Sequence, residues 1–121
     1  MATVEKFEDL RCWIASRELV KLVFTSCAKG KLARDFGTSD QFRRASLSVM
    51  NNIAEGFGRT SKREFIRFLD IAQSSAMEVK SMTYVLEDMD YLEQDLLVHI
   101  RTKAEETKKI TRGLMYSLGN R

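Results

Sequence analysis

The stretch AEGFGRTSKREF, Ala54–Phe65, decides between two kinds of fold. Its two glycines and the basic residues after them suit either the phosphate-binding loop of a nucleotide enzyme or a turn between two helices. A phosphate-binding loop needs a strand before it, together with a third glycine or a Gly-Lys-Ser/Thr ending. Only Gly56 and Gly58 are present, and the residues before them follow a helical pattern. We therefore predict a helix–helix turn, with Gly56 as the left-handed residue that ends the helix before the turn.

Apolar residues recur at intervals of three and four along four segments, which is the pattern of amphipathic helices. It predicts helices over residues 8–29, 41–57, 62–89 and 93–118. Near three of the predicted starts, a capping oxygen precedes an acidic or amide side chain by three residues. These pairs are Thr38 with Gln41, Ser61 with Glu64, and Asp90 with Glu93. Because the chain has no proline and its connections are short, we predict an all-α, antiparallel up-down-up-down four-helix bundle of one domain, residues 1–121.

The composition, 44% hydrophobic and 31% charged residues, is typical of a soluble globular domain. The apolar runs are too short to cross a bilayer, and the N-terminus lacks the layout of a signal peptide, so we expect a cytoplasmic protein without a membrane partner. Cys12 and Cys27 fall in one predicted helix, roughly 22 Å apart along its axis. A disulfide requires Cα atoms within about 7 Å, so we expect two reduced thiols in the core.

Catalysis and metal binding find little support in the sequence. His99 is the only histidine and stands between apolar residues, which favours a structural role over that of a general base. The cysteine and histidine spacings of metal sites are absent. Residues 87–95 contain five acids but lack the glycine and the spacing of a calcium-binding loop, so a solvated helix end is the simpler interpretation. We expect a non-enzymatic protein with no cofactor, no metal and no catalytic residue.

Basic residues flank the predicted turn and recur late in the last predicted helix, although the net charge is only +3. In an antiparallel bundle both groups would lie at one end. Residues 87–95 would lie at the other, where Lys29, Lys31 and Arg34 dilute their acidity. The candidate nucleic-acid-binding residues are Arg59, Lys62, Arg63, Arg67, Lys108, Lys109 and Arg112, with Arg121 at the same end. Phosphates are attracted to such a cluster of cations. A free helix start at Lys62 would suit an anion, and a solvated basic turn would have the same composition.

A polar stripe of short side chains follows helical spacing along the second predicted helix. It comprises Gln41, Arg44, Ser48, Asn52 and Glu55. Lysine and glutamate mixtures are typical of exposed helix faces, whereas amide and hydroxyl groups also suit directional hydrogen bonds at close contacts. We favour a buried or subunit-facing seam over open surface, with Glu78 as a candidate partner for Arg44.

Two stretches resemble a known family. The run QFRRASLSVMNNIAEGFGRTSKREFIRFLDIAQSSAMEV, Gln41–Val79, and the opening FEDLRCWIASREL, Phe7–Leu19, are similar to small bacterial four-helix-bundle proteins. That family includes the proteins encoded in intervening sequences of 23S rRNA genes. Residues Asn52–Arg59 are the most specific part of the resemblance. It implies a ring-shaped homo-oligomer, with pentamers as the known form, and no established enzymatic activity. It also implies a distant kinship with the accessory proteins of diversity-generating retroelements, which bind nucleic acid and a reverse transcriptase.

The sequence thus predicts a non-enzymatic homo-oligomer that binds RNA or DNA through a basic end. The alternative is a protein-interaction scaffold for a partner enzyme such as a reverse transcriptase, with nucleic-acid binding incidental.

Overall fold

The computed structural model describes residues 4–119, which form helices joined by short connections. Within that range there is no strand, so the predicted all-α class is confirmed. The long helices are α1 (Arg11–Cys27), α3 (Phe36–Phe57), α4 (Lys62–Asp88) and α5 (Gln94–Gly119). Two short helices flank α1: the 3-10 helix η1 (Phe7–Asp9) and α2 (Gly30–Arg34).

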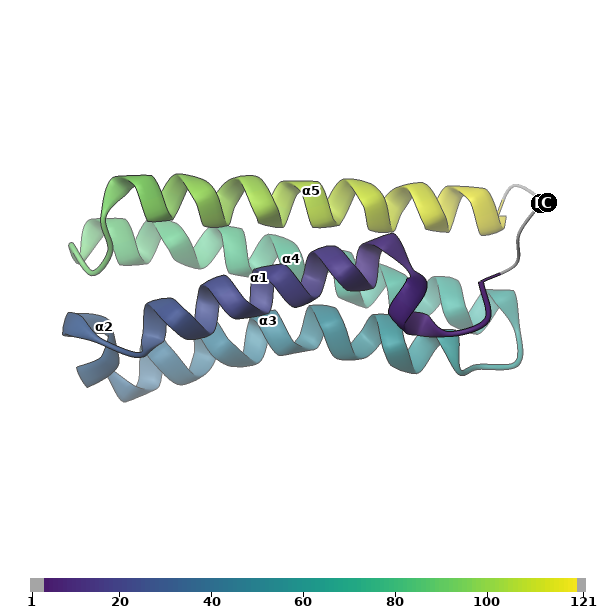
Figure 1. Cartoon of the computed structure of the whole chain (residues 1–121), viewed down its shortest axis with the longest axis horizontal. Coiled ribbons are helices and arrows are strands. Elements are labelled where there is room, and N and C mark those ends of the chain that lie inside the picture. The colour runs from purple at the N-terminus through teal and green to yellow at the C-terminus, as the bar shows by residue number, and fades with distance from the viewer. Residues whose placement is uncertain (1–3, 120–121) are drawn as a thin grey trace.

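The four long helices lie side by side along the long axis of the molecule (Figure 1). α1 contacts α3 and α5, and α4 contacts the same two helices, so a helical bundle encloses one core. α2 and the turn between α4 and α5 lie at one end of the bundle. The turn between α3 and α4 lies at the other end, together with η1 and the end of α5 (Figure 1). No helix in the described range is long and apolar enough to cross a membrane.

The core is built from the apolar stripe of each long helix. Its fully buried side chains include Leu19 and Val23 of α1, Phe42, Val49 and Ile53 of α3, Leu69 and Leu86 of α4, and Leu97 and Ile100 of α5. Burying one such side chain contributes about 1.5–3 kcal/mol, so packing of the stripes, more than helix propensity, stabilises the bundle. Ala72 and Ala76 of α4 are also fully buried, and their small size lets α4 approach its neighbours closely.

Polar atoms inside the bundle are satisfied locally. The Ser16 hydroxyl donates to the Trp13 carbonyl at 2.7 Å, and the Thr111 hydroxyl donates to the Thr107 carbonyl at 2.7 Å. Across residues 4–119, every buried side-chain nitrogen or oxygen has a hydrogen-bond partner. The buried polar groups are therefore all hydrogen-bonded, as a stable core requires.

The two cysteines are free and buried, as predicted. Burial raises the pKa of the Cys12 thiol to about 11 and raises the pKa of the Cys27 thiol as well. Since the thiolate is the reactive form of cysteine, both side chains remain protonated and unreactive at neutral pH.

Gly56 does not end its helix in the left-handed conformation, so that prediction is wrong. α3 continues to Phe57, and Gly58 follows with a right-handed φ of −78°. Gly56 is buried in the last turn of α3, where α4 crosses closely. A Cβ atom on Gly56 would lie 2.6 Å from the Cβ of Phe68 and 3.1 Å from a ring carbon of Phe65. The glycine is required by a close approach of two helices, not by its backbone freedom.

Of the three capping pairs predicted from the sequence, the structure confirms one. Ser61 accepts a hydrogen bond from the Glu64 N–H at 3.1 Å and caps α4 as predicted. α3, however, begins at Phe36, five residues before the predicted start, and its cap is Asp35, which accepts from the Thr38 N–H at 3.1 Å. The predicted pair of Thr38 and Gln41 is therefore wrong, because a carboxylate one turn earlier takes the role.

The third predicted cap lies in a turn. Asp90 adopts a left-handed φ of 56° after the end of α4, and α5 begins at Gln94. The predicted bounds of α4 and α5 are otherwise correct to within one residue. The first predicted helix, 8–29, is divided, because η1 precedes α1 and α1 ends at Cys27. The unpredicted α2 follows, and its first residue, Gly30, takes a φ of 74°, which favours glycine.

Candidate nucleic-acid interface

The basic turn comprises Arg59, Lys62, Arg63 and Arg67, around the connection between α3 and α4. Arg59 pairs with Glu55 at 3.1 Å, and Arg67 pairs with Glu64 at 3.6 Å. Lys62 and Arg63 are exposed and form no ion pair within residues 4–119. The free cations of the turn therefore stand in the first turn of a long helix, whose dipole and unpaired N–H groups favour anions.

The aromatic rings near the basic turn are in contact with other side chains. The Arg59 guanidinium lies 4.8 Å from the ring centroid of Phe68, and that of Arg67 lies 5.6 Å from it. Phe57 and Phe65 pack edge to face, with their centroids 5.9 Å apart. All three phenylalanines are half-buried. The turn offers charge for phosphates and no free ring on which a base could stack.

The second predicted basic group, Lys108, Lys109 and Arg112, does not join the turn. Gly119 at the end of α5 approaches Ile66 in the first turns of α4. Lys109 precedes Gly119 by ten residues, which corresponds to roughly 15 Å along the helix axis. Lys108 lies 3.9 Å from Glu105 in an ion pair on the side of the bundle. The single basic end predicted from the sequence is thus two separate groups, and Arg121 lies outside the described residues.

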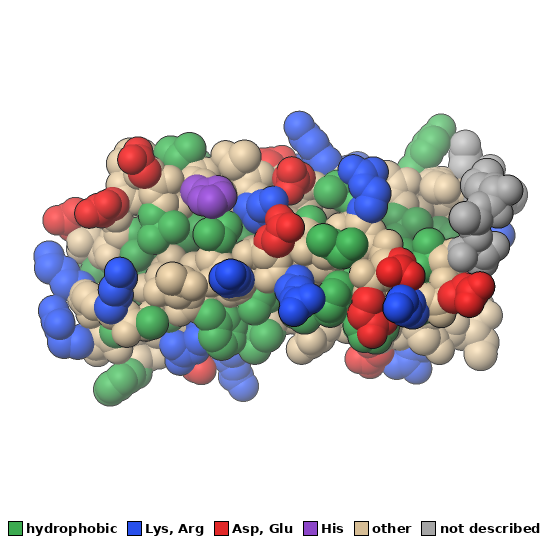
Figure 2. Space-filling model, in the orientation of Figure 1, with side chains coloured by type: hydrophobic (Ala, Val, Ile, Leu, Met, Phe, Trp, Pro, Cys, Tyr) green, Lys and Arg blue, Asp and Glu red, His purple; other side chains and the backbone are tan. Residues whose placement is uncertain are grey.

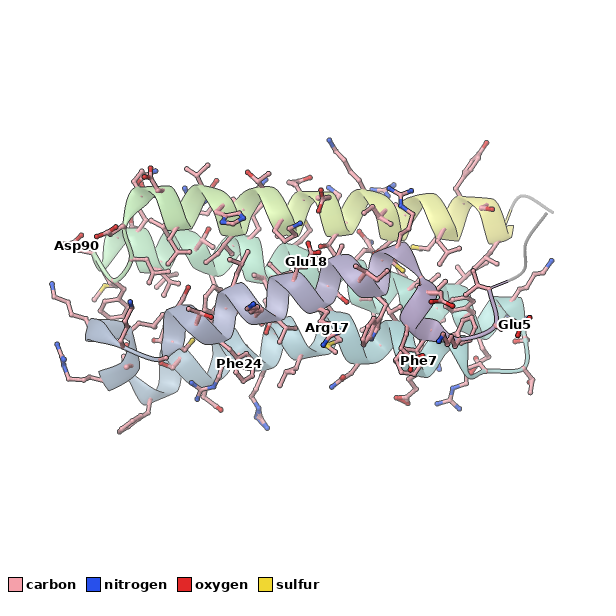
Figure 3. The ribbon with its side chains drawn as sticks, viewed as in Figure 1. Glu5, Phe7, Arg17, Glu18, Phe24 and Asp90 are labelled. Atoms are coloured by element: carbon pink, nitrogen blue, oxygen red, sulfur yellow. The ribbon has the colours of Figure 1, made fainter. Side chains whose placement is uncertain are left out.

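Acidic residues reduce the difference in charge that the sequence predicts between the two ends of the bundle. Glu5, Glu8 and Asp9 are exposed around η1, at the same end as the basic turn. Figure 3 labels Glu5 at this end and Asp90 at the opposite end. Figure 2 shows red and blue side chains together at both ends of the visible face. The acids around η1 restrict the positive potential to the α3–α4 side of that end.

The polar stripe of α3 is half-buried in its middle, at Ser48 and Asn52, and exposed elsewhere. Ser48 and Ser75 share a hydroxyl hydrogen bond of 2.8 Å between α3 and α4, and the Asn52 amide donates to the Ser48 carbonyl at 2.8 Å. The other members of the stripe are exposed. Their partners are Glu78 for Gln41 at 2.8 Å, Asp40 for Arg44 at 3.8 Å, and Arg59 for Glu55 at 3.1 Å. Glu78 therefore bonds to Gln41, and the expected Arg44–Glu78 contact is wrong.

The profile of the 23S rRNA-intervening sequence protein family matches residues 8–113 of the chain. The chain belongs to this family. The resemblance inferred from the two sequence stretches is thereby confirmed.

A crystal structure of a protein of unknown function, from the S23 ribosomal protein family of Bacteroides thetaiotaomicron VPI-5482, has a similar fold. Its TM-score is 0.77, with 21% sequence identity over 86% of this chain and 97% of that chain. At this identity the likeness concerns the fold alone. Comparison with curated proteins finds no match.

This 23S rRNA-intervening sequence protein family member also has a groove that the sequence analysis missed. The groove follows the junction of α1 and α5, with one hollow of about 490 Å³ beside Arg11 and Ile110 and another of about 450 Å³ beside Leu22 and His99. His99 is exposed on α5 and lines the second hollow, so it is not enclosed by the core. No group of three or more metal-binding side chains gathers anywhere in residues 4–119.

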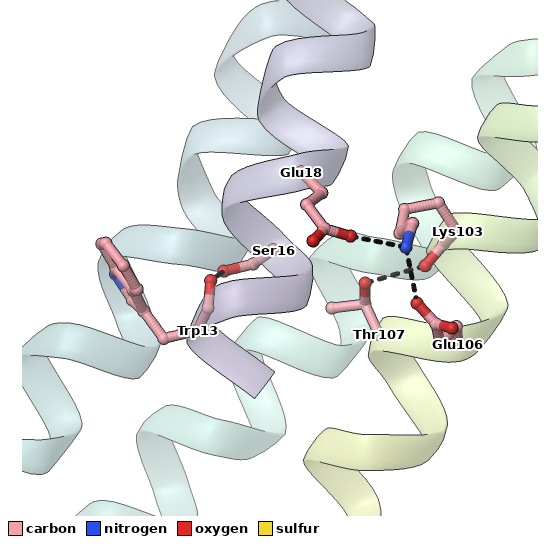
Figure 4. Close-up of polar contacts among 6 residues, drawn as sticks. All are labelled: Trp13, Ser16, Glu18, Lys103, Glu106 and Thr107. Atoms are coloured by element: carbon pink, nitrogen blue, oxygen red, sulfur yellow. Dashed lines mark hydrogen bonds and ion pairs between the residues drawn. The ribbon is translucent and has the colours of Figure 1, made fainter. Parts of the chain in front are cut away.

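One ion-pair cluster bridges the groove (Figure 4). The Lys103 ammonium donates to Glu18 of α1 at 2.7 Å and to Glu106 of α5 at 2.7 Å. These bonds raise the pKa of Lys103, with the bond to Glu106 as the largest cause. The bond from Lys103 lowers the pKa of Glu18. Glu18 and Lys103 are 85 residues apart, so no local pattern could reveal the contact.

Proposed function

We propose that this protein is a non-enzymatic, cytoplasmic homo-oligomer that binds structured RNA or duplex DNA through the basic turn. The observation that carries the proposal is the pair of Lys62 and Arg63, both exposed and without an ion pair in the described range. Free cations at a helix start attract phosphates, whereas cations already paired with carboxylates contribute less.

Recognition by this turn is expected to depend on phosphate charge and not on base sequence. The Ser61 hydroxyl accepts only from the Glu64 N–H, and the Ser61 carbonyl accepts from the Phe65 N–H, so the N–H groups of Lys62 and Arg63 are available to an anion. The arginines at 59 and 67 stack on Phe68, which leaves no ring free for a base. Such contacts position a protein on a nucleic-acid backbone without specifying its sequence.

In the proposed assembly, the four long helices form an antiparallel up-down-up-down bundle and five chains form a ring, as the family resemblance implies. The ring would present the basic turn several times to one ligand. Repeated weak contacts then act at high effective concentration, which compensates for the modest net charge of +3.

The oligomer is tested by sedimentation equilibrium, for which we expect five times the mass of the single chain. Asn52→Leu with Glu55→Ala is expected to reduce that mass, because the polar stripe would lose its contacts at a subunit interface. Asn51→Leu is the matched control, since Asn51 is an exposed neighbour off the stripe. A single-chain mass would contradict the ring. An unchanged double variant would place the stripe outside any interface.

The nucleic-acid site is tested with Lys62→Ala combined with Arg63→Ala, measured by fluorescence anisotropy on an RNA hairpin and a DNA duplex across a salt series. We expect weaker binding to both ligands and a log–log salt slope that is shallower by about one for each lost phosphate contact. Lys108→Ala with Lys109→Ala is the control, because it removes the same charge from the side of the bundle. Equal loss in both double variants would mean a diffuse charge effect and no site at the turn.

The protein-interaction scaffold is the second candidate, and the α1–α5 groove favours it. Leu10, Ile110 and Leu114 line the hollow beside Arg11, which is a mixed apolar and basic surface suited to a partner helix. If the wild-type protein binds neither hairpin nor duplex at low salt, the scaffold becomes the leading function. A pull-down with a purified partner enzyme, such as a reverse transcriptase, is then the next test.

A further inference from the structure

The end of the bundle opposite the basic turn has an unusual corner, formed by Lys29, Lys31, Arg34 and Phe36. We call it the α2 corner, because α2 (Gly30–Arg34) lies between its first and last residues. Figure 2 shows blue side chains at this end, below the red side chains beside the α4–α5 turn. Its charge belongs to the α1–α3 connection, which the proposed function does not use.

Phe36 is the most exposed large hydrophobic residue in the described range, at 79% of its full accessible surface. It is the first residue of α3, and the cap of that helix is supplied by Asp35 alone. The fold therefore does not need an aromatic ring at this position. An exposed aromatic ring beside free cations offers a face on which a base can stack.

The cations of the α2 corner point away from the core. Leu32 is fully buried and fixes the inward face of the short helix. With 3.6 residues per turn, Lys31 and Arg34 lie on the side away from Leu32, and Lys29 precedes the helix. All three cations are exposed and form no ion pair with any residue from 4 to 119.

The carboxylates nearest in sequence bond to other groups. Asp35 accepts hydrogen bonds from the Thr38 N–H at 3.1 Å, the Thr38 hydroxyl at 2.9 Å and the Tyr91 hydroxyl at 2.9 Å. The bond from the Thr38 N–H is the main cause of the lowered pKa of Asp35, followed by those from the two hydroxyls. Asp40 pairs with Arg44 at 3.8 Å. Lys31 and Arg34 thus keep their charge free of ion pairs within residues 4–119, whereas Glu93 of the α4–α5 turn lines a hollow together with Lys29.

We propose that the α2 corner binds single-stranded nucleic acid, with a base stacked on Phe36 and neighbouring phosphates on Lys29, Lys31 and Arg34. A free ring beside cations is the arrangement that binds single strands without sequence preference. The basic turn lacks a free ring, so the two surfaces differ in ligand class. An anionic membrane is a poorer match, because one phenylalanine beside a helix of five residues buries much less apolar area than an amphipathic anchor.

The test is fluorescence anisotropy of a labelled 12-nucleotide oligouridine with the full-length protein at low salt. Phe36→Ala is expected to weaken binding by about 5- to 150-fold, the range for loss of one base–aromatic stack. Lys31→Ala with Arg34→Ala is expected to weaken binding and flatten the salt slope. Met89→Ala is the matched control, because Met89 is an exposed apolar residue beside the acidic turn at the same end. It should leave affinity unchanged.

Phe36→Trp gives a second measurement that reports contact with a base. The only native tryptophan, Trp13, is 9% exposed, so the added indole supplies a signal that oligouridine can quench by stacking. We expect saturable quenching in this variant and little in the wild-type protein. The Lys62→Ala/Arg63→Ala variant should retain oligouridine binding, and Phe36→Ala should retain duplex binding, so each proposal can fail alone.

Three results would overturn this inference. The first is wild-type protein that does not bind oligouridine at low salt. The second is Phe36→Ala that binds oligouridine as tightly as wild type. The third is binding to phosphatidylserine vesicles that depends on Phe36 when binding to oligouridine does not, which would assign the corner to a membrane surface.

Discussion

Gly56→Ala is expected to destabilise the protein by up to about 2 kcal/mol, although alanine is the better helix former. An added Cβ would lie 2.6 Å from the Cβ of Phe68, and that atom cannot move without shifting α4. Overpacking of a core contact costs about 1–3 kcal/mol. The gain from replacing glycine inside a helix is about 1 kcal/mol at most. The steric cost therefore exceeds the gain in helix propensity, and Gly56→Val is expected to be worse.

Gly113→Ala is the matched control, because the same substitution should have the opposite sign there. Gly113 lies within α5, and nothing comes within 4 Å of the position that its Cβ would take. We expect stabilisation of about 0.5–1 kcal/mol. Urea unfolding at one protein concentration measures both variants, since assembly would make apparent stability depend on concentration. A stable Gly56→Ala protein would show that α3 and α4 separate at little cost.

The role of Gly56 could not be predicted from the local sequence. A glycine near the end of a helical pattern predicts a left-handed cap, and a glycine at a helix contact has the same local sequence. Only the position of Phe68 on the next helix distinguishes the two cases. The Ser61 cap, by contrast, depends on residues three apart in the chain, and its prediction was correct.

The start of α3 was missed for a similar reason. Asp35 and Thr38 form the true capping pair, and the glycine at position 37 made this segment resemble a connection. Tyr91, 56 residues further along the chain, also donates to Asp35 and fixes the α1–α3 connection against the α4–α5 turn. A contact between segments so distant in sequence has no local pattern.

The sequence predicts which basic residues belong to the candidate site, but it predicts their positions in the fold only in part. The basic turn was found because its residues are neighbours in sequence. The order of the helices directs Lys108 and Lys109 toward the same end, but ten residues of α5, roughly 15 Å, separate Lys109 from Gly119 at that end. The free and the paired cations could not be separated, because Arg59 and Arg67 find their carboxylates through side-chain geometry. That distinction selects Lys62 and Arg63 for the nucleic-acid test.

Ala76→Asp is expected to prevent folding. Ala76 has no exposed surface on α4, in the layer where α4 meets α3 and α5. An unpaired carboxylate there would cost several kcal/mol of desolvation, and a protonated one would still be too large for a site shaped by a methyl group. Domains of this kind have a total stability of about 5–15 kcal/mol, so one such change removes much or all of it.

The measurement for Ala76→Asp is far-UV circular dichroism with thermal melting, beside Ser74→Asp as the matched control. Ser74 is exposed on the same helix two residues earlier, so a carboxylate there remains hydrated and changes stability by less than about 0.5 kcal/mol. Raising the acidity should not rescue Ala76→Asp, because protonation removes the charge and leaves the excess volume. A soluble, fully helical Ala76→Asp protein with a cooperative melt would mean that this face of α4 is not part of the core.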